Sequence, residues 1–487
     1  MPVYIDIPEE LHGAIIDALA YHTILPPQQD QHQPALIDYA RSLNALRACS
    51  LVSHAFARRA QGHIYSTLVI RCSDPSIQNK KTKKREEAQR SNRMSAIFDA
   101  CASKPHIRRS IQSLFINLPN GGNPPSGLFP PDTEELRNLV YLCENVTSIF
   151  IYGRPLGGKN TSTRLPIVSL HRLLPTSFRI DKIATLHLWN VELDFGTVGK
   201  LVNLSDMSLS SVRFSDASYH ETIANRQHIL QVRWLYLEYI ADDILDLLIH
   251  NDYERGPSHY PVLDLSALRG FKLGPQRSQF ENRPGYVYTI QQVLEKSFPS
   301  LESLELSKLP FSGGWTRKED NLPAPRPFVT LSHPRLRELV IGSTVVNIDH
   351  PARSSFPPTQ IKAWLEAVPA GAILMDLSIK FRFKTAKRPR GGEASELVAL
   401  CDPIIDWASL CSELARIADG RPLRFSLYVI WVYWPAIVKS STAQQGILLQ
   451  LTAALEKGFD PVLRVLLRQS LPVWITPTII YSATIPE

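Results

Sequence analysis

One short apolar pattern recurs through most of this chain and constrains its fold more than any other feature. It consists of three apolar residues, the second three positions and the third five positions after the first. The pattern occurs nine times after residue 105, at intervals of 21 to 38 residues. The nine sets are Ile111/Leu114/Ile116, Val146/Ile149/Ile151, Ile183/Leu186/Leu188, Leu204/Met207/Leu209, Val232/Leu235/Leu237, Leu268/Phe271/Leu273, Leu301/Leu304/Leu306, Leu336/Leu339/Ile341 and Leu374/Leu377/Ile379.

This spacing predicts a stack of parallel strands. The last two positions of each set alternate, so they point to one face of a short strand. A gap of about 25 residues between sets leaves room for a helix or an extended loop that returns to the start of the next strand. Phe425 to Val432 is a tenth strand outside the pattern. Chance recurrence in an apolar chain is the alternative; nine nearly even sets argue against it, and the short interval between Ile183 and Leu204 is the weakest point.

The repeated body resembles a leucine-rich repeat, with one departure. The asparagine or cysteine that the repeat family carries three residues after the last leucine is absent. The resemblance therefore implies an irregular α/β solenoid with parallel strands over 106–440, whose turns are held by other contacts. Helices are expected at Ile290 to Lys296 and Gln360 to Val368, and 441–487 is expected to form a helical cap and tail. The residues standing at the asparagine position are Pro119, Val191, Val212, Ile240, Leu309 and Thr344.

The first seventy residues have helical periodicity. Pro8 suits a first helical turn, because its missing N–H would be unpaired there in any case. Leu11, Ile15 and Leu19 recur every fourth residue beside Ile16, and a second helix is expected from Ser42, a plausible N-cap. Strand composition follows over 64–70. The second helical stripe is Leu43, Leu46, Cys49, Val52 and Phe56.

Two blocks in this region, Ile7 to Leu19 and Leu46 to Leu68, resemble the F-box-like proteins of mushroom-forming fungi. Phe56 stands where many F-boxes carry tryptophan, and the gap between the blocks is longer than usual. The resemblance implies a small all-α domain over 1–70, a Skp-type adaptor as its partner and, through that adaptor, a cullin ubiquitin ligase. A basic linker and helix would occupy 71–105. The positions expected to contact the adaptor are Ile7, Pro8, Leu11, Ile15, Ile16, Leu46, Val52 and Phe56. The alternative is that these stripes pack against the repeat body.

Charge and targeting patterns favour a protein partner inside the cell. The net charge is +7, but the segment from Lys80 to Arg93 holds seven basic and two acidic residues and so contributes +5 of it. A nucleic-acid surface needs basic residues spread over a folded face, so no nucleic-acid partner is expected. The basic run fits a nuclear localisation signal and a solvated loop equally well. No secretory signal or membrane span is visible, which favours a cytoplasmic or nuclear location.

Catalytic and cofactor motifs are weak. Gly153 to Asn160 follows the phosphate-binding loop pattern except at Asn160, which lacks the hydroxyl that would hold magnesium. An exposed loop is the preferred interpretation. His220-Glu221 lacks the second histidine of a zinc helix. The aromatic residues Tyr428, Trp431, Tyr433 and Trp434 fit either a binding surface or, preferably, core packing of the last strand.

These patterns predict a non-catalytic protein without cofactor or metal. The leading hypothesis is a substrate-recognition adaptor of a Skp-cullin-F-box type ubiquitin ligase, which binds the Skp-type adaptor through its amino-terminal helices and a protein target through the repeat face. The first alternative is an interaction scaffold independent of any ligase. The second, a nucleotide-binding enzyme, rests on Gly153 to Asn160 alone. The sequence does not identify the target.

Overall fold

A computed structural model gives the fold of the chain. It describes residues 14, 16–18, 42–71, 95–118, 138, 140–153, 167–168, 180–193, 201–214, 230–238, 263–274, 290, 292–306, 331–347, 365–385, 407–433 and 471–484. The chain divides into two compact units, residues 1–230 with 251–262, and residues 231–250 with 263–487.

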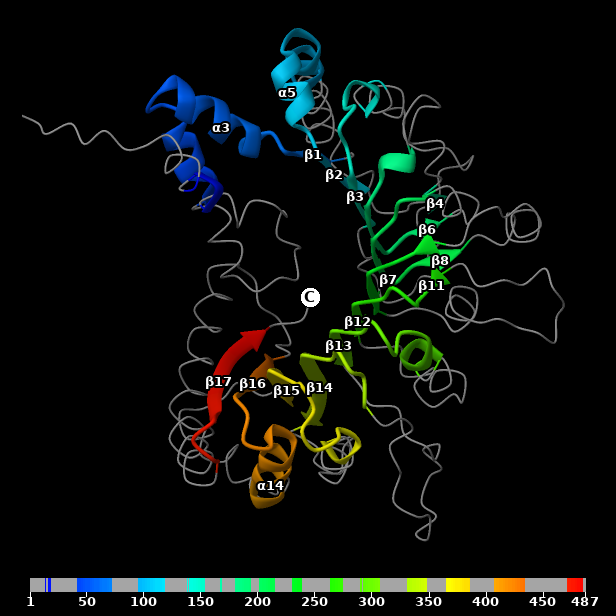
Figure 1. The fold of residues 1–487 in the computed structure, drawn as a ribbon. Helices are drawn as coiled ribbons and strands as arrows, with labels where there is room; N and C mark the ends of the chain where they lie inside the picture. Colours follow the sequence, from blue (N-terminus) through cyan, green and yellow to red (C-terminus); the bar gives the residue numbers. More distant parts are fainter. Residues whose placement is uncertain are drawn as a thin grey trace, which may run out of the picture. The chain divides into compact units, whose positions relative to one another are not determined.

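Twelve strands make one parallel sheet, in the order β1-β2-β3-β5-β7-β10-β12-β13-β14-β15-β16-β17 (Figure 1). The strands therefore follow one another in chain order, as a repeated α/β fold requires. Five of them lie in the first unit: β1 (Thr67–Arg71), β2 (Ser113–Leu118), β3 (Ser148–Gly153), β5 (Thr185–Trp189) and β7 (Asp206–Ser210). Seven lie in the second: β10 (Trp234–Glu238), β12 (Gly270–Leu273), β13 (Ser303–Leu306), β14 (Glu338–Asn347), β15 (Asp376–Thr385), β16 (Leu423–Tyr433) and β17 (Ile475–Thr484).

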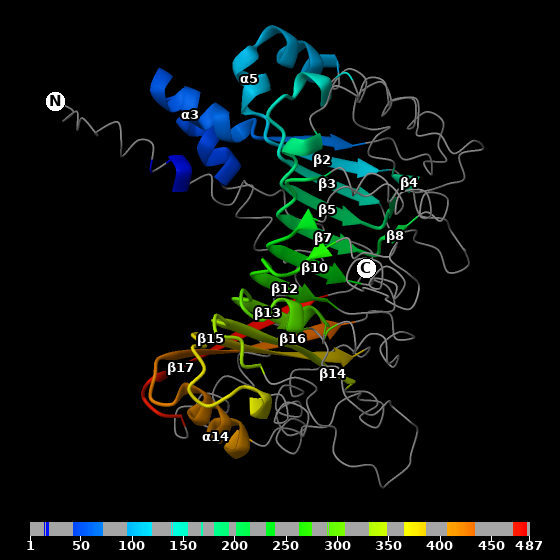
Figure 2. The ribbon, with the colours of Figure 1, turned by 45° about the vertical axis from the view of Figure 1, so that its right-hand side comes forward.

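The apolar triplets build the core of both units, which confirms the prediction of parallel strands. Figure 2 shows β2, β3, β5 and β7 stacked side by side. In the first unit the register pairs Leu114 with Ile149, Ile149 with Leu186, and Leu186 with Met207. In the second it continues through Leu235, Phe271, Leu304, Leu339, Leu377 and Phe425. All 27 residues of the nine triplets are buried. Stacked apolar side chains on one face of the sheet are therefore the main stabilising element.

A side-chain ladder holds the start of the strands in the first unit. Asn145 donates its amide N–H to the carbonyl of Arg109 at 2.9 Å. One repeat later Lys182 donates to the carbonyl of Glu144 at 3.2 Å, and next Asn203 donates to that of Asp181 at 2.6 Å. Each donor is the residue immediately before a triplet. These donors stand before the strands, whereas the asparagine that the resemblance implies would stand after them.

The turns after β5 and β7 are held by buried valines. Asn190 and Ser211, with φ of 51° each, turn the chain after the strand. Val191 and Val212, which stand three residues after the last apolar residue of their triplets, are buried. Short strands then follow and pair in a second parallel sheet, in the order β4 (Ile167–Val168), β6 (Glu192–Leu193) and β8 (Arg213–Phe214). Two further short strands, β9 (Leu230–Gln231) and β11 (Leu263–Asp264), pair with each other.

Helices precede several strands, in the place that the long gaps predict. They are α5 (Pro105–Ser110) before β2, helical residues at 290 and 292–296 before β13, and α14 (Trp407–Ala418) before β16. Helical residues 365–367 precede β15, and the 3-10 turn Ile180–Lys182 precedes β5. The helix expected at Ile290 to Lys296 is therefore confirmed, and that at Gln360 to Val368 is described over its last part. Within the expected helical cap and tail over 441–487, residues 441–470 lie outside the described residues.

The sequence pattern missed the last strand. β17 pairs parallel with β16 through ten residue pairs, inside the segment expected to be a helical cap and tail (Figure 1). Pro477 stands opposite Phe425 in this register and replaces the apolar residue of the triplet. Proline lacks the N–H of a ladder, but β17 is the outermost strand, where one side of the backbone needs no partner strand.

Candidate protein-interaction surfaces

The amino-terminal helical residues pack against one another. Ile16, Leu46 and Ala60 form a buried cluster that brings together the helical residues near 16, the helix over 42–49, and α3 (His54–Ile64). Cys49, Phe56 and Ile64 pack against it. Ser53 caps α3 by accepting a hydrogen bond from the Phe56 N–H at 3.3 Å.

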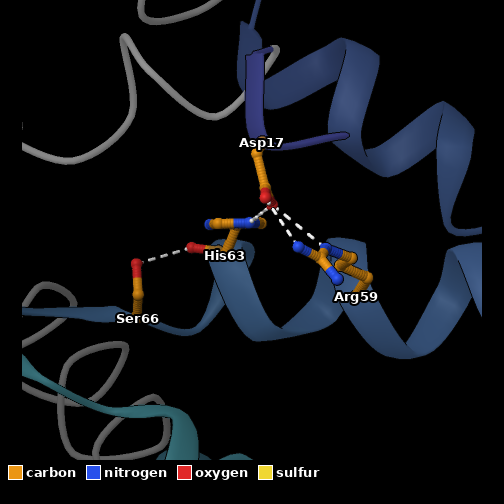
Figure 3. Close-up of polar contacts among 4 residues, drawn as sticks. All are labelled: Asp17, Arg59, His63 and Ser66. Atoms are coloured by element: carbon orange, nitrogen blue, oxygen red, sulfur yellow. Dashed lines mark hydrogen bonds and ion pairs between the residues drawn. The ribbon is translucent and has the colours of Figure 1, made fainter. Parts of the chain in front are cut away.

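A polar cluster ties the first helical residues to α3 (Figure 3). Arg59 donates to both carboxylate oxygens of Asp17, from Nε at 3.1 Å and from Nη2 at 2.6 Å. His63 Nε2 lies 2.8 Å from Asp17 Oδ1, and the Ser66 hydroxyl donates to the His63 carbonyl at 2.7 Å. The hydrogen bond from Arg59, with that of His63, lowers the pKa of Asp17 to about 2. Since the Ser66 carbonyl accepts the N–H groups of Gln112 and Ser113, the helices connect directly to the start of the sheet.

The turn between residues 42–49 and α3 exposes two large apolar side chains. Leu51 is 87% exposed and Val52 is 69% exposed. Their backbone N–H groups donate to the carbonyls of Ala48 and Cys49 at 3.0 and 3.1 Å, which fixes the turn. Exposed adjacent apolar residues on a fixed turn are a candidate contact with another protein. We name Leu51 and Val52 the apolar turn.

The residues expected to contact an adaptor fall into three groups. Ile16 and Leu46 are buried inside the helical cluster, and Phe56 packs partly buried against it. Val52 is exposed, and Leu51 beside it was not among the expected residues. Ile7, Pro8, Leu11 and Ile15 lie outside the described residues. The direct candidates are therefore the two members of the apolar turn, because the buried residues act through the shape of the cluster.

The sheet face opposite the apolar triplets carries a row of aromatic rings in the first unit. Phe115 stacks on Tyr152 with ring centroids 4.7 Å apart, and Phe150 stacks on His187 at 4.7 Å. Trp189 meets Tyr152 edge-on at 5.5 Å. Burial lowers the pKa of His187 to about 4, so this imidazole is neutral at pH 7. We call this side of the sheet the second face.

The second face of the second unit carries charges instead. Glu305 on β13 accepts from Lys272 Nζ at 3.1 Å and from Lys380 Nζ at 2.5 Å. Lys380 lies on β15 and so reaches across β14, whose register shifts between Ile341 and Thr344. Burial acts to raise the pKa of Glu305, but the two ammonium groups outweigh it and lower that pKa.

Aromatic rings flank both lysines of this cluster. Lys272 Nζ lies 4.9 Å from the ring centre of Tyr236, and Lys380 Nζ lies 5.7 Å from that of Tyr428. At the start of the strands, Arg424 pairs with Asp376 at 2.6 Å. Of the four aromatic residues singled out near the chain's end, Tyr428 is partly buried on this face. The side chains of Trp431 and Tyr433, and all of Trp434, lie outside the described residues.

Most of the motif residues weighed in the sequence lie outside the described residues. No group of three histidine, cysteine, aspartate or glutamate side chains among them is arranged to hold a metal ion. Only Gly153 of the loop from Gly153 to Asn160 is described, where it ends β3. His220, His228 and the basic run from Lys80 to Arg93 lie outside the described residues. None of the helices described has the length and apolar character needed to cross a membrane.

No protein-family model matches the chain. A search of curated proteins found no significant match.

Proposed function

We propose that this chain is the substrate-recognition adaptor of a Skp-cullin-F-box type ubiquitin ligase, with an F-box-like helical domain before an irregular leucine-rich-repeat-like body. It acts by binding, in the cytoplasm or the nucleus, and the transfer chemistry belongs to other subunits. The apolar turn would contact a Skp-type adaptor. The second face of the sheet would hold the target protein.

The observation that carries this proposal is the exposure of Leu51 and Val52 beside a cluster that is already packed. The helical cluster buries Ile16 and Leu46 within its own chain, so the domain has a defined shape without a partner. A defined shape that leaves two adjacent large apolar side chains in water favours docking by another protein. The resemblance of the two amino-terminal blocks to F-box-like proteins supports the Skp-type adaptor as that protein.

The test is co-purification of the full chain with a recombinant Skp-type adaptor. Leu51→Asp combined with Val52→Asp should abolish co-purification, because two carboxylates would be desolvated in the contact. Val473→Asp changes a more exposed valine far along the sequence, 95% exposed against 69% for Val52, and should leave co-purification intact. If the double variant binds the adaptor as well as the wild-type chain does, the apolar turn is not part of the contact. Absence of binding by the wild-type chain would reject the ligase assignment.

An interaction scaffold independent of a ligase is the second candidate function. The packing of Ile16, Leu46 and Ala60 against one another favours the scaffold function, because these side chains are buried without any partner protein. In that case the same experiment would yield no Skp-type adaptor, and the second face would still bind a protein.

A further inference from the structure

One column of residues in the second unit stands immediately before the strands. Its members Arg233, Arg269, Glu302 and Arg337 precede β10, β12, β13 and β14. Their backbones are hydrogen-bonded in series: the N–H of Arg269 donates to the carbonyl of Arg233 at 2.8 Å, that of Glu302 to Arg269 at 2.7 Å, and that of Arg337 to Glu302 at 2.8 Å. Successive members are therefore neighbours, about 4.8 Å apart across the sheet. We call this the arginine column.

The guanidinium groups of the arginine column differ from the other cations of this sheet. Arg233, Arg269 and Arg337 are exposed. Within the part of the chain that the structure describes, none of the three has an ion pair or a side-chain hydrogen bond. Lys272, Lys380 and Arg424, by contrast, are each paired with a carboxylate on the second face.

The pair Arg233 and Arg269 is the unusual part of this column. The two residues are direct neighbours, with no acidic residue between them, and like charges at neighbouring positions of a sheet destabilise it. Glu302 separates Arg269 from Arg337, so the concentrated positive charge is confined to the first two arginines. Arginines that served only to solubilise the surface would not need to be adjacent. Their arrangement instead places two exposed groups of five N–H donors at neighbouring positions of the sheet.

A partly exposed tryptophan follows the first of the two arginines in the chain. Trp234 follows Arg233 in the chain, Gly270 follows Arg269, and Trp234 and Gly270 are register partners. The Trp234 ring lies against Gly270, where a Cβ would stand 1.9 Å from its Cε3 atom. The indole is nevertheless 47% exposed. Because Gly270 has no side chain, the Trp234 ring can lie directly on the backbone of β12, and the rest of the ring stays exposed to solvent. Tryptophan and arginine are the residues that most often dominate the binding energy of protein interfaces.

We propose that Arg233, Arg269 and Trp234 form a docking site for a carboxylate-rich segment of a partner protein. The two guanidinium groups bind carboxylates of the segment through paired N–H donors, and an apolar side chain of the segment covers the indole. This inference rests on the proposed function in one respect, since it assigns the segment to the target that the adaptor selects. It names the chemistry of that target: acidic residues beside an apolar one.

The test measures fluorescence polarisation of a labelled peptide of about ten glutamates with one central leucine, titrated with the full chain. Arg233→Ser with Arg269→Ser should weaken binding about tenfold, and Trp234→Ala should weaken it as well. Arg335→Ser with Arg421→Ser removes the same charge from two exposed arginines outside the column, and should leave the affinity within about twofold of wild type. Equal loss in both double variants would reduce the effect to net charge and overturn the proposal.

Two further outcomes are decisive. Absence of binding by the wild-type chain, or a labelled oligothymidylate that binds more tightly through the same arginines, would overturn the proposal. Arg269→Ser should leave the thermal unfolding midpoint unchanged or raise it, because it relieves repulsion; a clear fall would show that the column is structural. The peptide is measured without any Skp-type adaptor. Failure of the proposed function in the co-purification and failure of this inference in the titration are therefore separate results.

Discussion

The Trp234 ring and Gly270 are in direct contact, because the side chain of Trp234 on β10 lies on the backbone of Gly270 in the neighbouring strand β12. A Cβ at residue 270 would stand 1.9 Å from Cε3 and 2.1 Å from Cζ3 of that ring. Gly270→Ala should therefore force the indole off the sheet and destabilise the chain by about 1 kcal/mol or more. Urea unfolding measures this, and the double variant with Trp234→Ala should recover most of the loss. Gly62→Ala is the control, because a Cβ there meets nothing within 4 Å. Equal effects at the two glycines would argue against the contact.

The ion pair between Asp17 and Arg59 joins segments 42 residues apart. Arg59→Gln should loosen the helical cluster and speed hydrogen exchange of the α3 amides, on the order of twofold because the pair is half-exposed. Arg58→Gln on the same helix should leave exchange unchanged. The pKa of Asp17 is lowered from 3.8 to about 2, so its stabilising effect is present above pH 4 and lost as pH falls through 2. If Arg59→Gln and Arg58→Gln change the exchange rates equally, the ion pair between Asp17 and Arg59 does not stabilise the helical cluster.

The repeated core could be predicted from sequence because its signal is local. Each triplet places Leu304 and Leu306, or their equivalents, on one face of a strand without reference to any distant residue. The register then follows, since a slip of one residue would expose the whole row. β17 could not be predicted in this way, because Pro477 interrupts the alternation of apolar residues. Only the pairing of β17 with β16 identifies this segment as a strand.

The candidate surfaces were harder to predict. Val52 belongs to the second helical stripe in the sequence, yet the chain turns at Leu51 and Val52 and leaves both exposed, while Leu46 of that stripe and Ile16 beside the first stripe are buried. Which members of an apolar stripe face inward depends on the angle between the packed helices. The periodicity of apolar residues in the sequence does not predict that angle. Arg233 and Arg269 are 36 positions apart, and only the sheet register makes them neighbours.

The donor ladder before the strands should contribute measurably to stability. Asn203→Ala removes the hydrogen bond to the Asp181 carbonyl and leaves that carbonyl without its side-chain donor. We expect a loss of about 0.5–1.5 kcal/mol in the free energy of unfolding, measured by urea titration. Val202→Ala, at the preceding exposed position, should cost much less. If both substitutions cost the same, the ladder has no special role.

The thiols of Cys101 and Cys143 should resist alkylation in the folded chain. Burial raises the pKa of Cys143 to about 12 and also raises that of Cys101, so neither forms the reactive thiolate at pH 8. Iodoacetamide followed by peptide mass spectrometry should find both unmodified in the native chain and modified in urea. Cys49, which is partly exposed, serves as the internal comparison. Rapid native labelling of Cys143 would show that its surroundings open readily.

Acid should weaken the first unit through His187. Burial lowers the pKa of this imidazole to about 4, and its Nδ1 is buried without a hydrogen-bond partner in the described part of the chain. An unfolded histidine binds its proton near pH 6.5, so the unfolded state gains protons first as pH falls. Stability attributable to His187 is therefore complete above pH 6.5 and is lost progressively down to pH 4. His187→Phe would keep a ring against Phe150 and should reduce the fall in thermal unfolding midpoint between pH 7 and pH 5.

A residual pH dependence is expected in that variant. His333 is also buried with a lowered pKa, and it retains its own contribution. His54→Gln, on an exposed histidine, should reproduce the full wild-type dependence. If His187→Phe loses as much stability as the wild-type chain over the same range, the imidazole is protonated in the folded state, and the aromatic row on the second face must be open enough to water to accept that charge.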